Sequence, residues 1–284
     1  MDLLSMNNVQ NSSPIFIILF KNRFMQEALH IAAIQANLIW EQPEQNRQNF
    51  EQVMRKMSAD VELVVLPEMF STGFTMNPQS VAETMEGETV SWMKATATSR
   101  KIALVGSVVI EEDGNYYNRA IFVHPDGTLE IYDKRHAFGL AGEDEEYTSG
   151  KKKLIVNYKG WKLFPLICYD LRFPVWSRYD DDYDALIYMA NWPKPRILAW
   201  DSLLRARAIE NMSYCIGVNR VGLDENQYEY IGHTSVYDFL GERIADTEEA
   251  KEGFLECKLI KSDLQKTRTK LNFLNDRDSF EIKL

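Results

Sequence analysis

The sequence contains few cysteines, and their positions do not suggest a disulfide or zinc framework. Cys168, Cys215 and Cys257 are the only three among 284 residues, and they form no CxxC pair. Disulfide scaffolds and structural zinc sites need thiols in closely spaced pairs, so the sequence predicts neither. A protein without disulfides fits a reducing compartment, and we expect a cytoplasmic location. Cys215 and Cys257 lie within strand-like runs and are expected to be inert core thiols.

Long hydrophobic runs are also absent. The longest apolar stretch near the start is PIFIILF, far shorter than the roughly 20 residues that span a bilayer. It lacks a small-residue cleavage site before KNRF, so the sequence predicts neither a membrane helix nor a secretory signal. Residues 1–24 differ in character from the rest of the chain. We expect them to be an N-terminal extension outside the fold, with one domain over residues 25–284.

Basic residues are too few for a general nucleic-acid-binding protein. The formal net charge is −10, and the only dense basic run is the KKK of residues 151–153. Because binding to phosphates needs clustered Lys and Arg, no nucleic-acid partner is expected. The phosphate-binding patterns GxxxxGK and GxGxxG are missing as well, so no nucleotide cofactor is indicated.

One acidic segment, RYDDDYDA, has the spacing of a calcium-binding loop but not its other requirements. Asp180, Asp182 and Asp184 stand at the first, third and fifth loop positions. The sixth position, which needs glycine, is Ala185, and the twelfth, which needs glutamate, is Asn191. We therefore interpret this segment as a solvated loop, and the sequence predicts no metal site.

Strand-like and helix-like segments alternate from residue 28 onward, with antiparallel hairpins between them. Turns are expected at EEDGN, HPDGT and NYKGW, because Asp-Gly and similar pairs favour tight turns. The simplest architecture is two sheets packed face to face with helices outside, in one domain. Strands are expected at 28–38, 61–67, 101–110, 183–191, 214–222, 234–239 and 253–259, and helices around 50–57, 86–100, 196–212 and 262–271.

Three of the strand-like runs are followed by residues with complementary chemistry. VVLPEMF contains Glu68, EIYDKRHAF contains Lys134, and FPLICYDLRFP contains Cys168. Because ligands bind beyond the carboxyl ends of strands in α/β sheets, we expect these side chains to converge at one edge of a sheet. There a carboxylate can accept the thiol proton, and an ammonium can stabilise an oxyanion.

The motifs together resemble a known family. The segments LPEMFSTGF, YDKRHAF, CYDLRFPVWSR, ANWPKPR, RARAIEN and GVNRVG occur in this order between about residues 28 and 257. They are similar to those of the nitrilase superfamily of carbon–nitrogen hydrolases, and specifically of its omega-amidase branch. The resemblance implies an α/β fold, a four-layer α-β-β-α sandwich that usually pairs with a second copy. A homodimer or higher homo-oligomer is therefore expected.

The same resemblance implies roles for individual residues. Glu68 would be the general base, Lys134 the cation that stabilises the oxyanion, and Cys168 the nucleophile. The backbone N–H of Tyr169 would lie beside that nucleophile and bind the oxyanion with Lys134. The family has a second glutamate in the loop after the lysine, and Glu143 takes that position.

Several assignments remain open between two interpretations. Glu145 and Glu146 are close enough to Glu143 to be alternatives for the second glutamate. Arg172 either binds a substrate carboxylate or forms a buried ion pair that fixes the CYDLRFP turn. Asn191 and Trp192 either line the pocket or only shape a loop. Phe138 either walls the acyl site or is a core aromatic.

Two further motifs are assigned to structure rather than to catalysis. Cys-His is the commoner pairing for a reactive thiol, but with Glu68 and Lys134 present we do not expect His136 to be the base. In RARAIEN, we expect Arg205, Arg207 and Glu210 to form ion pairs within the protein beside the active-site sheet.

The resemblance implies a function without a cofactor. The expected reaction is hydrolysis of the terminal amide of 2-oxo dicarboxylic acid monoamides, 2-oxoglutaramate and 2-oxosuccinamate, through a cysteine thioester. One alternative is an N-carbamoyl-amino-acid, aliphatic amide or nitrile hydrolase of the same superfamily. The other, from a different class, is a non-catalytic interaction protein that retains the fold.

Overall fold

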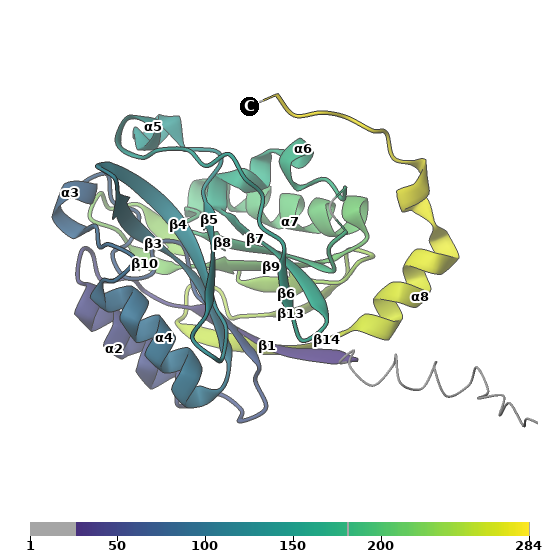
Figure 1. The fold of residues 1–284 in the computed structure, drawn as a ribbon, viewed down its shortest axis with the longest axis horizontal. Helices are drawn as coiled ribbons and strands as arrows, with labels where there is room; N and C mark the ends of the chain where they lie inside the picture. The colour runs from purple at the N-terminus through teal and green to yellow at the C-terminus, as the bar shows by residue number, and fades with distance from the viewer. Residues whose placement is uncertain (1–26, 181, 284) are drawn as a thin grey trace, which may run out of the picture.

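Continuous apolar runs form the centres of two six-stranded sheets that pack face to face (Figure 1). The computed structural model describes residues 27–180 and 182–283, so the extension expected at residues 1–24 lies outside the described residues. The first sheet has the order β14-β1-β2-β3-β4-β5. Its strands are β14 (Gly253–Ile260), β1 (Ala28–Gln35), β2 (Leu63–Val65), β3 (Ala103–Glu112), β4 (Asn115–Val123) and β5 (Leu129–Asp133).

Like the first sheet, the second sheet has parallel strands at its centre and antiparallel strands at its edges. Strands β7, β8 and β9 are parallel, whereas β6, β12 and β13 pair antiparallel. The order is β13-β12-β9-β8-β7-β6, with β13 (Arg243–Asp246), β12 (Ser235–Tyr237), β9 (Tyr214–Asn219), β8 (Ala185–Ala190), β7 (Trp161–Ile167) and β6 (Val156–Tyr158). A separate small sheet joins β10 (Val221–Leu223) to β11 (Glu229–Ile231).

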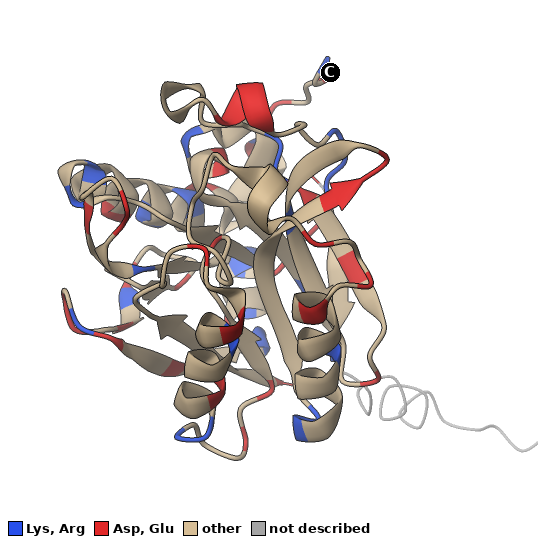
Figure 2. Cartoon of the chain, turned by 90° about the vertical axis from the view of Figure 1, so that its left-hand side faces the viewer, with Lys and Arg blue, Asp and Glu red and all other residues tan. Residues whose placement is uncertain are grey.

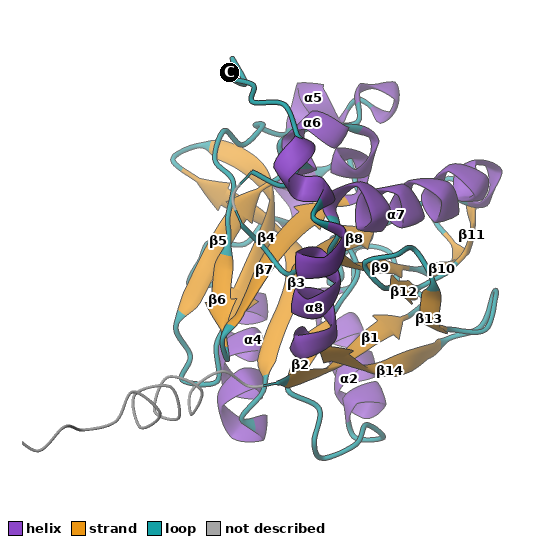
Figure 3. Cartoon of the chain, turned by 90° about the vertical axis from the view of Figure 1, so that its right-hand side faces the viewer, coloured by secondary structure: helices purple, strands orange, loops and turns teal. Residues whose placement is uncertain are grey.

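Helices cover the outer faces of both sheets, as Figure 3 shows. Helices α2 and α4 pack on the first sheet through a shared apolar cluster, and α7 packs on β9 and β12 of the second. The helices are α2 (Pro43–Met54), α3 (Pro78–Val81), α4 (Glu88–Arg100), α5 (Glu143–Glu146), α6 (Pro174–Ser177), α7 (Ile197–Asn211) and α8 (Lys261–Leu271). Short 3₁₀ helices are η2 (Gly139–Ala141), η3 (Cys168–Arg172), η4 (Lys194–Arg196) and η5 (Phe273–Asp276).

The main core lies between the two sheets, and alternation along β1 shows how the layers form. Leu29, Ile31 and Ala33 face the second sheet, whereas Ala32 and Ile34 face α2 and α4. Successive strand side chains point to opposite faces, so a strand covered on both sides must be apolar throughout. The α-β-β-α sandwich implied by the sequence is therefore confirmed.

Basic and acidic residues are interspersed along the chain in Figure 2. The acidic helix α5 stands out at the top of that view. No helix in the described part of the chain is long and apolar enough to cross a membrane.

The two sheets bring their catalytic candidates to one end of the molecule from opposite sides. Strands β2 and β5 belong to the first sheet, whereas β7 and β8 belong to the second. Glu68 and Lys134 follow β2 and β5, and Cys168 follows β7. The expectation that all three side chains meet at the edge of one sheet is therefore wrong, because the site forms between two sheets.

Candidate active site

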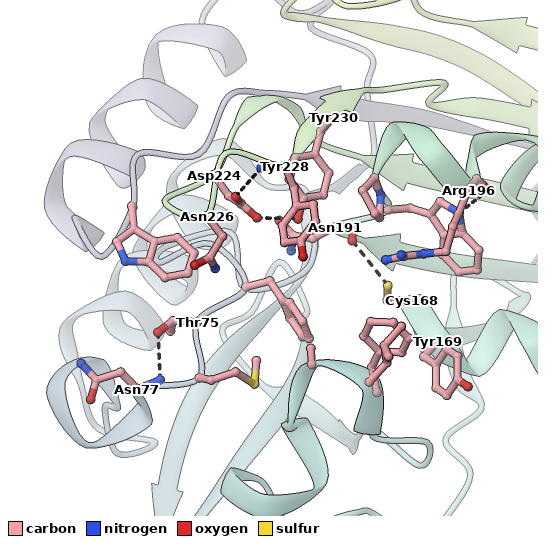
Figure 4. Close-up of a pocket in the computed structure, with 18 of the residues that line it drawn as sticks. Thr75, Asn77, Cys168, Tyr169, Asn191, Arg196, Asp224, Asn226, Tyr228 and Tyr230 are labelled. Atoms are coloured by element: carbon pink, nitrogen blue, oxygen red, sulfur yellow. Dashed lines mark hydrogen bonds between the residues drawn. The ribbon is translucent and has the colours of Figure 1, made fainter.

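Cys168 sits at a sharp turn between strand β7 and the 3₁₀ helix η3. Its backbone φ is 44°, in the left-handed region, which costs a residue with a Cβ atom about 1–2 kcal/mol. Its side chain lines a cavity of about 820 Å³ (Figure 4) and is 9% exposed. Its Sγ lies 3.9 Å from the carbonyl oxygen of Asn191. The turn therefore presents a thiol to the cavity from an otherwise buried strand end.

Asp170 fixes this turn from within η3. Its Oδ2 accepts hydrogen bonds from the Ile167 N–H at 3.0 Å and the Tyr132 hydroxyl at 2.7 Å. Its Oδ1 accepts the backbone N–H of His136 at 3.0 Å and lies 2.8 Å from Nδ1 of that residue. The buried carboxylate thus ties the cysteine turn to the segment after β5 that carries Lys134. Side chains of the two sheets are positioned against one another by this contact.

Lys134 lies between two carboxylates behind the thiol. Its Nζ is 2.9 Å from Oε1 of Glu68, and 2.9 and 2.8 Å from the two oxygens of Glu143. The three side chains are 3%, 0% and 1% exposed. A buried charge needs partners of this kind, because an unpaired one costs several kcal/mol. The three N–H donors of the ammonium are all engaged, two of them on the same carboxylate.

The loop after Lys134 places one of its glutamates in the site and leaves the others outside. Glu143 begins α5, and its Oε2 accepts the backbone N–H of Phe138 at 2.6 Å. Glu145 is exposed, and Glu146 accepts a hydrogen bond from the Gln79 amide at 3.1 Å. Of the three candidates, only Glu143 contacts Lys134.

Two asparagines complete the contacts of the carboxylates. The Asn118 amide donates to Oε1 of Glu68 at 2.9 Å and to Oε1 of Glu143 at 3.1 Å. The Asn191 backbone N–H donates to Oε2 of Glu68 at 2.8 Å, and its side-chain amide donates to the Glu68 carbonyl at 2.7 Å. Both oxygens of Glu68 are therefore held, and Asn191 contacts the base candidate and the thiol together.

Burial and the surrounding charges set the protonation states of the site. Burial raises the pKa of the Cys168 thiol well above its ordinary value; Glu68 and Glu143 add to this rise, and Lys134 opposes it. Although burial lowers it, the pKa of Lys134 is raised overall by Glu143 and Glu68. Burial and repulsion by Glu68 raise the pKa of Glu143, against the attraction of Lys134. The thiol is consequently protonated at neutral pH, and the lysine is charged.

The cavity wall beside the thiol is aromatic and basic. The guanidinium of Arg172 lies 4.9 Å from the ring centroid of Trp192, and that of Arg196 lies 5.1 Å from that of Phe138. The rings of Phe138 and Tyr169 meet edge to face at 4.9 Å. All five residues line the cavity, as does Asn191. Among the described residues, no carboxylate lies within ion-pair distance of Arg172, so the buried ion pair considered for it is not observed.

The opposite side of the cavity comes from other elements. Asp224 lies between β10 and β11 and accepts hydrogen bonds from the Tyr228 N–H and the Tyr230 hydroxyl, each at 2.9 Å. Thr75 and Asn77, before α3, lie across the cavity from Cys168 in Figure 4. The cavity therefore has a basic side at the thiol and a polar, partly acidic side away from it.

The remaining motifs have structural contacts. The ring of His136 stacks on Phe173 at 3.8 Å and faces Asp170, so the imidazole is placed against a carboxylate. Within RARAIEN, Arg207 pairs with Glu210 at 2.9 Å, as expected, whereas Arg205 lies over the ring of Tyr237.

The acidic segment is not the uniformly solvated loop expected from the sequence, because Asp184 is buried. The other two cysteines lie within strands, as expected, but Cys257 is only partly buried. Asp182 pairs with Lys162 at 2.5 Å, and Asp184 pairs with Lys261 at 2.7 Å. No cluster of His, Cys, Asp or Glu side chains suited to a metal ion occurs among the residues described. Cys215 is fully buried in β9, and burial raises the pKa of Cys257 in β14 to about 11.

The sequence did not predict the residues on the opposite side of the cavity, and it also missed three residues near the thiol. Asn118 lies within a strand and Asp170 within the CYDLR turn, and neither carries a pattern that distinguishes it from a surface polar residue. Arg196 belongs to ANWPKPR, a motif that was recognised without a role for its arginine. The signal that could have indicated a role for Arg196 is its position two residues after the Trp-Pro-Lys segment that follows β8.

Comparison with known proteins gives one consistent family. Residues 30–269 match the carbon-nitrogen hydrolase family. Omega-amidase YafV of Yersinia enterocolitica is 40% identical over 89% of this chain and 98% of that protein. The 2-oxoglutaramate amidase of Bacillus subtilis is 32% identical over 76% and 85%. The solved structure of XC1258 from Xanthomonas campestris, a CN-hydrolase superfamily protein with an arsenic adduct in the active site, has a TM-score of 0.88 and 37% identity, covering 91% of this chain and 100% of that chain.

Proposed function

The chain belongs to the carbon–nitrogen hydrolase family, and we propose that it is an omega-amidase with Cys168 as its nucleophile. The observation that carries this proposal is the Glu68–Lys134–Glu143 cluster beside the thiol that lines the cavity, with Asn191 in contact with both Glu68 and Cys168. Similarity to omega-amidases and 2-oxoglutaramate amidases over most of the chain supports the substrate class. That class is the 2-oxo dicarboxylic acid monoamides, with 2-oxoglutaramate and 2-oxosuccinamate as the expected members.

The first half of the reaction forms a thioester. Glu68 accepts the thiol proton while Sγ of Cys168 attacks the carbonyl carbon of the terminal amide, and a carbon–sulfur bond forms. This concerted transfer suits a thiol whose pKa is raised by burial, because a free thiolate need not accumulate. Glu68 then gives the proton to the amide nitrogen, the carbon–nitrogen bond breaks, and ammonia leaves.

The second half hydrolyses the thioester. Glu68 takes a proton from water as the water oxygen attacks the thioester carbon. The carbon–sulfur bond breaks, and the departing sulfur recovers that proton from Glu68. The products are the 2-oxo dicarboxylic acid and the free thiol. No proton is gained or lost by the protein over the cycle.

Lys134 and a backbone N–H stabilise the oxyanion of both tetrahedral intermediates. Because Glu143 accepts two of the three ammonium donors, one can turn to the oxyanion while the Lys134–Glu143 pair persists. The Tyr169 N–H belongs to the first turn of η3, where N–H groups have no partner within the helix. Losing one such donor costs about 3 kcal/mol in the barrier.

Arg172 is the proposed ligand of the substrate carboxylate. It lines the cavity four residues after the nucleophile and stacks on Trp192. A guanidinium can bind a carboxylate through two parallel hydrogen bonds, which fixes the orientation of a small substrate. Phe138 and Trp192 then form apolar walls around the acyl chain.

The deciding experiment measures ammonia release from 2-oxoglutaramate. We expect Cys168→Ala to lower kcat/KM by about four orders of magnitude or more, because the covalent route is removed. Cys257→Ala is the matched control, since this thiol lies on β14 outside the site, and it should retain parental activity. A Cys168→Ala enzyme within about tenfold of the parent would contradict the proposal.

A substrate panel separates the alternatives within the superfamily. The same assay on N-carbamoyl amino acids, aliphatic amides and nitriles should give lower kcat/KM values than on 2-oxoglutaramate. The oligomeric state and the cytoplasmic location stay predictions. Leu198 and Ile209 on α7 are 78% and 50% exposed, and this apolar exposure supports pairing of two copies of the chain through this helix.

A further inference from the structure

Two guanidinium groups line the cavity on the side of the thiol. Arg172 and Arg196 each lie over an aromatic ring of the wall. In the part of the chain that the structure describes, neither has an ion pair or a hydrogen-bond acceptor for its guanidinium. The terminal carboxylate of the proposed substrate needs only one of them. The second therefore requires its own explanation.

The indole of Trp192 connects the two arginines. The guanidinium of Arg172 lies over its ring, and its Nε1–H donates a hydrogen bond to the carbonyl oxygen of Arg196 at 2.8 Å. The Arg196 N–H in turn donates to the Pro193 carbonyl at 3.0 Å, which closes the 3₁₀ turn η4. The backbone of Arg196 is thus fixed beside the ring that supports the carboxylate ligand. Figure 4 shows Arg196 on the same side of the cavity as Cys168.

Helix stability does not explain an arginine at this position. Arg196 is the N-cap of α7, a helix of 15 residues, and its side chain makes no capping hydrogen bond. A cation at a helix N-terminus is disfavoured by the helix dipole, and Arg is not among the residues that cap well. An arginine at this position therefore carries a small cost to the helix, which points to a role in the cavity.

We propose that Arg196 is a specificity-determining residue that selects 2-oxo acids over 2-amino acids. This inference rests on the proposed function. With the substrate carboxylate on Arg172, the adjacent C2 oxygen can accept a hydrogen bond from the second guanidinium. A 2-ammonium group would offer no acceptor and would place a like charge beside Arg196, which is unfavourable in a partly desolvated cavity.

The acidic groups of the cavity do not offset this repulsion. Glu41 accepts a hydrogen bond from Thr75 at 2.7 Å, and Asp224 is engaged with Tyr228 and Tyr230. Thr75 and Asp224 lie across the cavity from Arg196 in Figure 4. A ligand held at the thiol by its amide and at Arg172 by its carboxylate therefore meets a cation, and not an anion, at C2.

The test compares three amides that differ only at C2: 2-oxoglutaramate, glutaramate and L-glutamine. For Arg196→Gln we expect kcat/KM on 2-oxoglutaramate to fall by about tenfold to hundredfold, mainly through KM, because a charge-assisted hydrogen bond is lost. Activity on glutaramate, which has no C2 oxygen, should stay within about threefold. The ratio of glutamine to 2-oxoglutaramate activity should rise.

Two variants serve as comparisons. Lys194→Gln removes a charge from the same 3₁₀ turn, at an exposed residue that pairs with Glu229 outside the cavity, and should leave all three activities unchanged. Arg172→Gln should lower activity on every carboxylate-bearing substrate. Thermal unfolding of Arg196→Gln checks that the variant folds.

The outcomes distinguish this inference from the proposed function. If Arg196→Gln lowers activity on all three amides equally, or on none, Arg196 does not discriminate between substituents at C2 and the inference is overturned. Arg196→Lys, which keeps the charge, should still disfavour glutamine; a glutamine activity equal to that of Arg196→Gln would also count against it. If the parental enzyme prefers N-carbamoyl acids or nitriles, the proposed function itself fails.

Discussion

At the scale of single residues, the Asn118 amide holds two carboxylates together beside one lysine. One NH₂ group donates to both Glu68 and Glu143, at 2.9 and 3.1 Å. The backbone carbonyl of Asn118 accepts a hydrogen bond from the backbone N–H of Lys134 at 3.0 Å. Two buried carboxylates beside a single ammonium repel each other, and each neutral donor reduces the cost of keeping both ionised.

We expect Asn118→Asp to weaken catalysis and to change its pH dependence. The new carboxylate replaces a donor by a third negative charge, which raises the pKa of neighbouring carboxyl groups. The proposed base, Glu68, must be ionised to accept the thiol proton, so the acidic limb of the kcat/KM profile should move to higher pH. Asn115→Asp, at the exposed start of the same strand, is the control. An unmoved acidic limb in Asn118→Asp would refute this role.

Residue identity made part of the site predictable. A thiol, a carboxylate and an ammonium that each follow a strand have complementary chemistry, and the surrounding motifs indicate the family. Asn118 and Asp170 act by hydrogen bonds to partners distant in the chain. Nothing local marks such a side chain, because the partner is defined only by folding.

At the scale of elements, helix α7 supports the turn that carries the proposed nucleophile, Cys168. Arg207 is 3% exposed, and its Nη2 donates to the Leu171 carbonyl of η3 at 2.6 Å. Its Nη1 contacts Glu210 at 2.9 Å. The strained conformation of Cys168 persists only if its surroundings over-determine it. The contact between α7 and η3 is one such constraint.

Replacing Arg207 should therefore affect stability and activity together. We expect Arg207→Met to lower the free energy of unfolding by about 2 kcal/mol, because a charge-assisted buried hydrogen bond is lost. The kcat of the folded variant should also fall, as η3 becomes less well held. Arg205→Met, on the exposed face of α7, should cost less than about 1 kcal/mol. Urea unfolding and the ammonia assay would measure both effects, and equal losses in the two variants would contradict the prediction.

The regular elements were largely predictable because their signals are local. The three predicted hairpins form between β3 and β4, β4 and β5, and β6 and β7. The expected helix around 50–57 exists but ends at Met54. Met57 lies beyond the end of the helix and packs against the apolar cluster under α2 and α4. The β10–β11 pair was not anticipated, because strands of three residues are too short to show a hydrophobic period. The single strand expected at 214–222 is divided into β9 and β10.

At the scale of the whole molecule, the site depends on the packing of two sheets. Sheet membership follows from pairings between distant strands, so the sequence pattern could not show that β7 belongs to a different sheet from β2 and β5. Tyr214 provides one direct link between them. Its hydroxyl, on β9, donates to the Ile260 carbonyl at 3.1 Å and accepts the Ile260 N–H at 3.0 Å, at the end of β14.

This link should make stability depend on alkaline pH. Burial raises the pKa of Tyr214 from 10.0 to about 12. The folded state therefore keeps a proton that the unfolded chain has lost, and the contribution is complete below pH 10 and disappears as the pH rises to about 12. Tyr214→Phe should be less stable than the parent at pH 8, and the difference should shrink above pH 10. A constant difference in unfolding free energy from pH 8 to 11 would contradict this.

The pairing of β1 with β14 joins residues 28–35 to residues 253–260. During synthesis, the outer edge of β1 has no native partner until the ribosome has passed the last strand, and unpaired strand edges promote aggregation. The nascent chain thus carries an open template until residues 253–260 have been synthesised. We expect activity to arise only after that point, so the moment at which ammonia release begins would time the closure of the first sheet.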